Sequence, residues 1–147
     1  STSTDWLGGT TAWNLALNHT TTEVTSRGEY IDDDRERSIE EVSPDTRYNV
    51  SANHMMDGWR ALARVSYFGD WFDPNQGMSY DGEHVVDVEF SYDLNESSSV
   101  MLGGNNIFDE AGSKKHNGAG GAGNTYSEFA PMGFSGAFWY AKYSYNF

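Results

Sequence analysis

The last part of the chain alternates between apolar and more polar side chains. One face of the segment from Ser135 to Phe147 holds Ala137, Trp139, Ala141, Tyr143, Tyr145 and Phe147. The opposite face holds Gly136, Phe138, Tyr140, Lys142, Ser144 and Asn146. Because successive side chains of a β-strand point to opposite sides, this pattern predicts a final strand with an aromatic, apolar face. Strands of transmembrane barrels combine such a face toward lipid with a polar face toward the lumen.

The same alternation predicts five earlier strands, at residues 10–20, 46–55, 59–67, 84–93 and 99–108. Two kinds of connection alternate between the strands: long segments at 21–45, 68–83 and 109–134, and short turns at 56–58 and 94–98. Outer-membrane barrels show this alternation, with long extracellular loops and short periplasmic turns. We therefore expect an all-β fold of about six antiparallel transmembrane strands. An open sheet in lipid would leave unpaired edges, so other strands should complete the barrel.

Charged side chains fall on the strand faces opposite the apolar ones, where the predicted barrel has its lumen. They are Arg60, Arg64, Asp87, Glu89 and Lys142. Asp87 and Glu89 share one strand face, which is compatible with an acid/base pair or with salt bridges to arginines on a neighbouring strand. We prefer the salt bridges, to Arg60 or Arg64.

Glycines are concentrated in two places. Gly103 and Gly104 lie inside a predicted strand, which indicates a bulge or a close backbone approach. The tract from Asn117 to Asn124 is of low complexity, and no Gly-Lys-Ser/Thr follows it as a phosphate-binding loop would require. We interpret this tract as a loop tip.

The composition narrows the possible partners and chemistry. The chain of 147 residues has 22 acidic and 9 basic residues and a net charge of −13, which argues against a nucleic-acid partner. It has no cysteine, which excludes disulfides, thiolate metal ligands and a cysteine nucleophile. Aromatics make up 15% although the mean hydropathy is −0.65, a combination that suits a barrel because only alternate strand residues meet lipid. Residues 1–5 do not resemble a signal peptide, so an outer-membrane protein would have lost its leader or would begin upstream.

No constellation of catalytic residues stands out. The histidines are not in a metal-binding spacing such as H-E-x-x-H: His19, His54, His84 and His116. Residues 21–45 are strongly acidic, and the run from Asp32 to Asp34 is typical of a solvated loop. A cation site is the alternative for this loop, although its spacing does not match a calcium-binding loop. We expect no enzyme activity, no metal and no cofactor.

Three aromatic side chains of the segment 68–83 are candidate ligand-binding residues. They are Trp71, Phe72 and Tyr80. Rings in a long loop can stack on a sugar or a siderophore, and they can equally pack the loop on itself. Both interpretations stay open at this point.

Three motifs near the end of the chain resemble the C-terminal end of TonB-dependent outer-membrane receptors. Asn106-Ile107-Phe108-Asp109 is similar to the N-L-F-D signature on the penultimate strand of that family. The segment 131–140 resembles the family's entry to the last strand, although Ala137 stands where the family often has a basic residue. The closing residues 143–147 resemble the terminal signal that the barrel-assembly machinery recognises. We expect four aromatic side chains to form this signal and to face lipid: Trp139, Tyr143, Tyr145 and Phe147.

The resemblance implies a 22-stranded barrel in the cell outer membrane, in which residues 1–147 would form the last strands, 17 to 22, without the plug domain. Receptors of this family take up iron-siderophores, cobalamin or carbohydrates with energy from the TonB complex. The implied partners are outer-membrane lipid, the other barrel strands, the plug, TonB, the assembly machinery and a small nutrient. Two alternatives stay open: a small standalone or multi-chain outer-membrane barrel, and a soluble secreted β-sandwich that binds carbohydrate or calcium through Trp71, Phe72 and the acidic loop.

Overall fold

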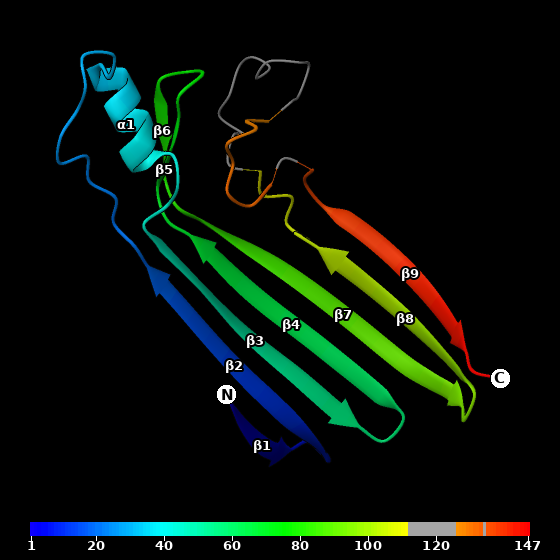
Figure 1. The fold of residues 1–147 in the computed structure, drawn as a ribbon. Coiled ribbons are helices and arrows are strands. Elements are labelled where there is room, and N and C mark those ends of the chain that lie inside the picture. The colour runs from blue at the N-terminus through cyan, green and yellow to red at the C-terminus, as the bar shows by residue number, and fades with distance from the viewer. Residues whose placement is uncertain (112–125, 134) are drawn as a thin grey trace.

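A computed structural model describes residues 1–111, 126–133 and 135–147 and shows one large antiparallel sheet (Figure 1). The order of its strands is β1 (Thr2–Trp6), β2 (Gly9–His19), β3 (Thr46–Met56), β4 (Trp59–Phe68), β7 (Glu83–Asn95), β8 (Ser98–Asn105) and β9 (Phe138–Tyr145). A separate hairpin consists of β5 (Trp71–Asp73) and β6 (Met78–Tyr80), and one helix, α1, spans Asp33–Glu41. The expected all-β, antiparallel fold is confirmed.

The connections are segregated between the two ends of the sheet. The three long ones lie at the end where β2, β4 and β8 finish, and the tight turns lie at the other end (Figure 1). The predicted Asp57–Gly58 turn joins Met56 to its strand partner Trp59. Consecutive pairing of β3, β4, β7, β8 and β9 confirms the predicted alternation of long and short connections.

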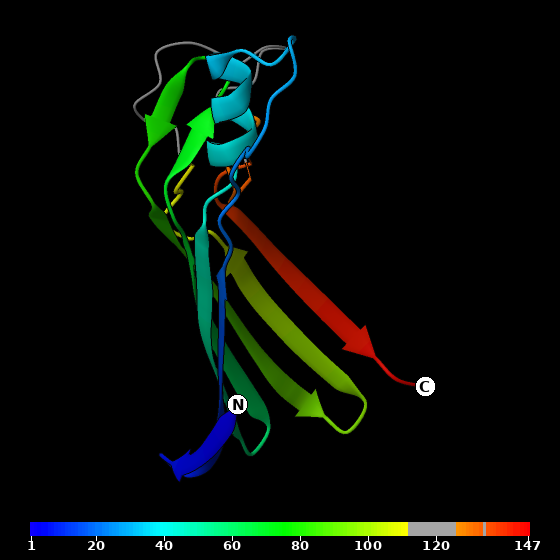
Figure 2. The same cartoon turned by 60° about the vertical axis from the view of Figure 1, so that its left-hand side comes forward.

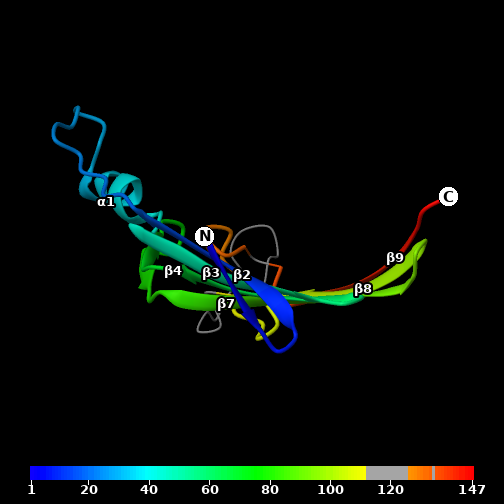
Figure 3. The ribbon, with the colours of Figure 1, turned by 90° about the horizontal axis from the view of Figure 1, so that it is seen from below.

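The large sheet is a single curved layer with two free edges. Seen from below, it bends into an arc from β2 to β9 (Figure 3). Among the described residues β1 and β9 do not pair with each other, and the only other sheet is the two-stranded β5–β6 hairpin. The β-sandwich alternative is therefore wrong for the described part of the chain, because no second sheet covers the first.

The sheet has one strand more than the six expected. Residues of β1 are mostly polar, so their pattern of hydrophobicity gave no signal. Their pairing with β2 in register from Thr2↔Trp13 to Trp6↔Gly9 is supported by side chains: Trp13 Nε1 donates to Thr4 Oγ1 at 3.0 Å, and Thr10 Oγ1 donates to Asp5 Oδ1 at 2.7 Å. Threonine and tryptophan suit strands through such cross-strand pairs.

The acidic segment contains a helix where the charge pattern predicted only a loop. Asp32 is the N-cap and accepts a hydrogen bond from the Arg35 backbone N–H at 2.8 Å, and acidic residues occupy the first turn of α1, where the helix dipole favours them. No residue of α1 is buried, so the prediction that this charged run is solvated is confirmed. No helix in the described residues is long and apolar enough to span a membrane.

The glycine pair of β8 has neither the predicted bulge nor a backbone as its nearest neighbour, because side chains lie against both glycines. A Cβ on Gly103 would overlap the ring of Tyr140, and a Cβ on Gly104 would lie 2.8 Å from the Trp139 ring. The register of β8 with β9 is regular through both glycines, and the irregularity falls between Asp93 and Asn95 instead. Two consecutive aromatic rings of β9 therefore lie against two consecutive glycines, one ring on each face of the sheet.

The largest cluster of buried hydrophobic side chains lies in the connections at one end of the sheet. Trp71, Tyr80 and Ala130 form the core cluster, with Phe129 and Met132 packed against it. Figure 2 shows α1 and the β5–β6 hairpin side by side at the end of the sheet where the long connections lie. The sheet itself leaves large apolar side chains uncovered, including Leu15 (70% exposed) and Trp139 (64%).

Candidate functional site

The β5–β6 hairpin owes its core to two stacked rings. Trp71 and Tyr80 are paired across the hairpin, their ring centroids are 4.4 Å apart, and they are 2% and 8% exposed. Burial, with a further contribution from the Asp73 carboxylate, raises the pKa of the Tyr80 phenol. In the structure the rings of Trp71 and Tyr80 pack against each other within the loop. Direct contact between these rings and a ligand stays a prediction.

A buried carboxylate joins this hairpin to the segment that precedes β9. Asp73 is 1% exposed and accepts hydrogen bonds from Ser127 Oγ at 2.6 Å and from the Asn75 backbone N–H at 2.9 Å. Asn75 Nδ2 also donates to Glu128 Oε1 at 2.8 Å. These polar contacts, together with the apolar packing of Phe129 and Ala130, hold two long connections in one folded unit.

Helix α1 is attached to the same unit by one arginine. The guanidinium of Arg37 lies 4.1 Å from the centroid of the Phe72 ring, and Arg37 Nη2 donates to Ser79 Oγ at 2.7 Å. Arg37 Nε also donates to Glu41 Oε2 at 2.8 Å within the helix. A cation above an aromatic ring is favourable even where water reaches it, so this contact can hold α1 against the hairpin without a buried apolar interface. We call α1, the β5–β6 hairpin and residues 126–133 the loop cluster.

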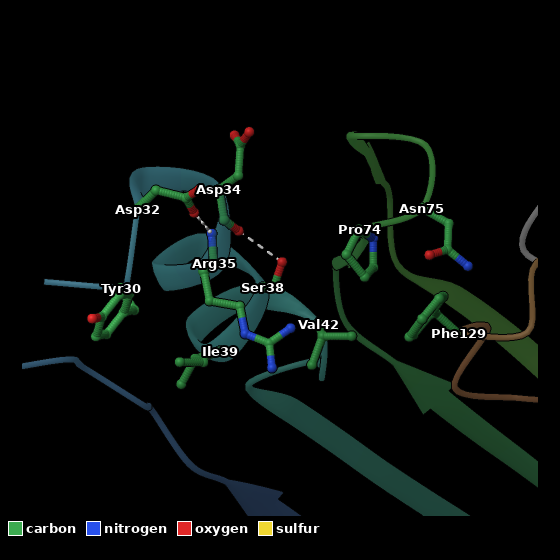
Figure 4. A pocket seen from close by; sticks show the side chains of 10 residues that line it. All are labelled: Tyr30, Asp32, Asp34, Arg35, Ser38, Ile39, Val42, Pro74, Asn75 and Phe129. Atoms are coloured by element: carbon green, nitrogen blue, oxygen red, sulfur yellow. Dashed lines mark hydrogen bonds between the residues drawn. The ribbon is translucent and has the colours of Figure 1, made fainter. Parts of the chain in front are cut away.

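An open groove of about 640 Å³ lies between α1 and the hairpin (Figure 4). It is lined by Tyr30, Asp32, Asp34, Arg35, Ser38, Ile39, Val42, Pro74, Asn75 and Phe129. Of these residues, the sequence pointed only to the acidic run, as an alternative cation site. The others come from separate connections, which are brought together only in the folded loop cluster. In the described residues no group of three or more acidic or histidine side chains is placed to hold a metal ion.

On the polar face of the sheet, opposite the exposed apolar side chains, four charged residues form two ion pairs. Arg60 Nη2 forms an ion pair with Glu89, whose second oxygen accepts a hydrogen bond from Tyr140 Oη at 2.9 Å. Arg64 binds one oxygen of Asp87 through two nitrogens, at 2.7 and 2.9 Å. The preferred interpretation of Asp87 and Glu89 as salt-bridge partners is confirmed.

Replacing Glu89 with glutamine should lower the free energy of unfolding by about 1–2 kcal/mol, because Arg60 would keep its charge without a carboxylate in a half-buried position. The matched control is Glu41→Gln, whose partner Arg37 and whose own side chain are both well exposed, and it should change stability by less than about 0.5 kcal/mol. Denaturant titration of both variants in detergent measures the difference. Equal effects would contradict a special role of the Arg60–Glu89 pair.

The motif from Asn106 to Asp109 forms a turn that fixes the end of β8. Asn106 has φ of 50°, donates through Nδ2 to the Glu110 carbonyl, and accepts from the Glu110 backbone N–H at 2.8 Å. Its own backbone N–H donates to Asp87 Oδ1 at 2.9 Å. Asp109 Oδ1 accepts from the Ala137 backbone N–H at 2.9 Å, next to Gly136, where a Cβ would overlap that oxygen. The motif therefore ties β7 and β8 to the start of β9, while Phe108 is exposed.

Asn106→Ala should destabilise the protein by about 2 kcal/mol, because it removes both hydrogen bonds to Glu110 and places alanine at a positive φ. Asn106→Gly loses the same hydrogen bonds but tolerates the backbone conformation, so it should cost about 1 kcal/mol less. Unfolding titrations of the two variants separate these contributions. A larger loss in the glycine variant would contradict the backbone argument.

The aromatic set of the last strand lies on the uncovered apolar face. Trp139, Tyr143 and Tyr145 are exposed there, and the Phe147 ring makes an edge contact with Tyr145 at 5.1 Å. Tyr143 Oη donates to Ser98 Oγ at 3.2 Å. Contact of these side chains with lipid and their recognition by the assembly machinery stay predictions.

The histidines that the structure describes are separate from one another. His54 Nδ1 contacts Thr11 Oγ1 at 2.8 Å beside Trp59, and His84 Nε2 contacts Tyr48 Oη at 2.8 Å. His19 Nδ1 contacts Thr46 Oγ1 at 2.9 Å. Each of them contacts a hydroxyl group of another strand, and His54 and His84 also contact aromatic rings. His116 and the glycine tract 117–124 lie outside the described residues.

The fold is similar to that of two solved receptors. A mutant of the ferric enterobactin receptor from Pseudomonas aeruginosa matches 97% of this chain with a TM-score of 0.56 and 17% identity. The ferric-catecholate import receptor Fiu from E. coli K12, in a closed form, matches 94% with a TM-score of 0.59 and 15% identity. In each case this chain spans 20% of the receptor. No family model and no curated protein matches the sequence.

Proposed function

We propose that this chain is the C-terminal part of the barrel of a TonB-dependent outer-membrane receptor that takes up a scarce small nutrient. The observation that carries the proposal is the uncovered apolar face of the large sheet, opposite a face of paired charges. A water-soluble sheet would cover the first face, because exposed apolar patches of this extent are unfavourable in water. The similarity to two siderophore receptors supports the same class.

Aromatic side chains mark both ends of the apolar face, as the two girdles of a membrane barrel do. Tyr48 and Tyr67 stack at 5.0 Å near the loop cluster, and Trp59 lies 5.9 Å from Phe90 near the tight turns. The distance from Trp59 to Tyr67 along β4 is about 27 Å at 3.4 Å per residue. A strand tilt of about 40° reduces this to about 20 Å, close to the roughly 25 Å apolar band of such barrels.

The polar face and the two free edges complete the assignment. The ion pairs of Arg60 and Arg64 would line the lumen, where a plug domain packs in receptors of this family. The edges of β1 and β9 expose backbone groups, each of which would cost several kcal/mol in lipid unless another strand pairs with it. Other strands of the same receptor are the proposed partners, with the TonB complex acting through the plug and the assembly machinery through Trp139, Tyr143, Tyr145 and Phe147.

The loop cluster would then lie on the extracellular side and contribute to nutrient capture. The nutrient classes that fit the family are iron-siderophores, cobalamin and carbohydrates. Trp71, Phe72 and Tyr80 would serve this function by holding the loop cluster in shape, and direct ligand contact through Trp71 and Tyr80 would require the hairpin to open.

Lipid contact of the apolar face tests the proposal. The full chain, reconstituted in vesicles that contain brominated lipid, should show strong quenching of Trp139 fluorescence and little quenching of Trp71, measured with variants in which the other tryptophans are replaced by phenylalanine. Trp71 is the matched control because it is buried in the loop cluster. A chain that stays soluble and monomeric without detergent, with its apolar face covered, would overturn the proposal. Closure of the chain into a complete barrel of its own would favour the standalone alternative.

A further inference from the structure

The groove between α1 and the β5–β6 hairpin has the composition of a ligand site. Its volume of about 640 Å³ falls within the range of small-molecule sites. Tyr30 is 92% exposed, and the partly buried Phe129 lines the opposite side of the groove. Ile39 and Val42 add aliphatic surface from α1. The groove thus offers two rings and an apolar floor, which can hold the flat, carbon-bound face of a cyclic ligand.

The polar groups of the groove include both donors and acceptors. Arg35 makes no ion pair with a carboxylate of the described residues, whereas Arg27 and Arg37 in the same region are paired with acidic side chains. In Figure 4 the Arg35 side chain extends along α1 toward Val42, and its guanidinium makes no hydrogen bond to the other residues drawn. The Asn75 amide oxygen supplies an acceptor to the same space, whereas the Asp34 carboxylate points away from the other lining side chains.

The charge of the lining selects among ligand classes. Asp32 and Asp34 against Arg35 leave the groove with a net charge of −1 at neutral pH, within a chain whose net charge is −13. A polyanion would therefore be repelled. A metal cation is not favoured either, since no group of three metal-ligating side chains occurs in the described residues. A ligand rich in hydroxyl groups fits both the charge and the mixture of donors and acceptors, because each hydroxyl both donates and accepts.

We propose that this groove binds a neutral, hydroxyl-rich ring ligand of the sugar type, with Tyr30 and Phe129 against the ring and Arg35 and Asn75 on its hydroxyls. The inference names a nutrient class for the receptor and rests on the proposed function for its extracellular location. The ligand chemistry follows from the groove alone. It does not involve Trp71 and Tyr80, whose rings are buried on each other.

Titration of the detergent-solubilised full chain with neutral oligosaccharides derived from starch, cellulose and mannan tests the inference, with isothermal calorimetry as the readout. At least one should bind saturably, and Tyr30→Ala or Arg35→Ala should weaken it by about tenfold or more. Tyr30→Phe should retain most of the affinity, because it keeps the ring. Arg47→Ala, which removes an arginine outside the groove, should leave the affinity unchanged.

Two results would overturn the inference: no oligosaccharide of the panel binds, or binding is unaffected by both groove variants. Preferential binding of an anionic ferric tricatecholate that depends on Arg35 would also overturn it. These outcomes are distinct from failure of the proposed function. That failure would show as absence of Trp139 quenching in lipid, a measurement that requires no sugar and leaves the calorimetric result intact.

Discussion

Replacing Trp71 with alanine should unfold the loop cluster while leaving the large sheet in place. Trp71 is 2% exposed, stacks on Tyr80 and belongs to the core cluster with Ala130. Removal of a buried indole costs about 3–5 kcal/mol, through lost burial and the cavity left behind. The loop cluster has few other buried apolar side chains, so it cannot absorb a loss of this size.

Hydrogen exchange of the backbone amides measures the effect. Amides of β5, β6 and the segment 126–133 should lose most of their protection in Trp71→Ala, while those of β3 and β4 should keep theirs. The matched control is Trp139→Ala, which removes the same side chain from an exposed position on β9. It should leave protection in the loop cluster unchanged. Equal loss of protection in both variants would mean that the loop cluster is not an independent folded unit.

The sheet could be predicted from the sequence because one of its faces is mostly apolar and the other mostly polar. Residues Trp59 to Tyr67 alternate with the exception of Leu62, and the structure pairs them with β7, which alternates in the same way from Val86 to Phe90. Strand β1 could not be recognised by its pattern because Thr2 to Asp5 carry no apolar side chain, and their pairing depends on hydroxyl and carboxylate contacts with β2. A periodic pattern of apolar residues reveals strands that have one buried or lipid-facing side. Strand β1 has almost no apolar side chains, so it shows no such pattern.

The loop cluster could not be predicted because its contacts join residues that are distant in sequence. Asp73 meets Ser127, and Arg37 meets Phe72 and Ser79. The helix α1 had one local signal, since Asp32 followed by acidic residues and Arg35 is a recognisable N-cap. The charge pattern of the segment by itself indicates a solvated loop. The groove depends on all three connections, so its residues become a candidate site only after the fold is known.

Replacing Gly103 of β8 with valine should strongly destabilise the pairing of β8 with β9. A side chain at this position would overlap the ring of Tyr140, which lies across Gly103 and donates to Glu89 Oε2 at 2.9 Å on the next strand. The valine would displace the ring, break its hydrogen bond and disturb the pairing of β8 with β9. Overpacking of this kind costs about 1–3 kcal/mol, and loss of the hydrogen bond adds about 1 kcal/mol.

Denaturant unfolding in detergent and hydrogen exchange in β9 should both report this change. Gly28→Val is the matched control, because no atom lies within 4 Å of a Cβ built there. It should leave stability nearly unchanged. The double variant Gly103→Val with Tyr140→Ala removes the overlapping ring, so it should recover part of the protection of β9 that Gly103→Val loses. No recovery would mean that valine harms β8 by itself. Recovery would show that the Tyr140 ring on Gly103 sets the position of β9 relative to β8.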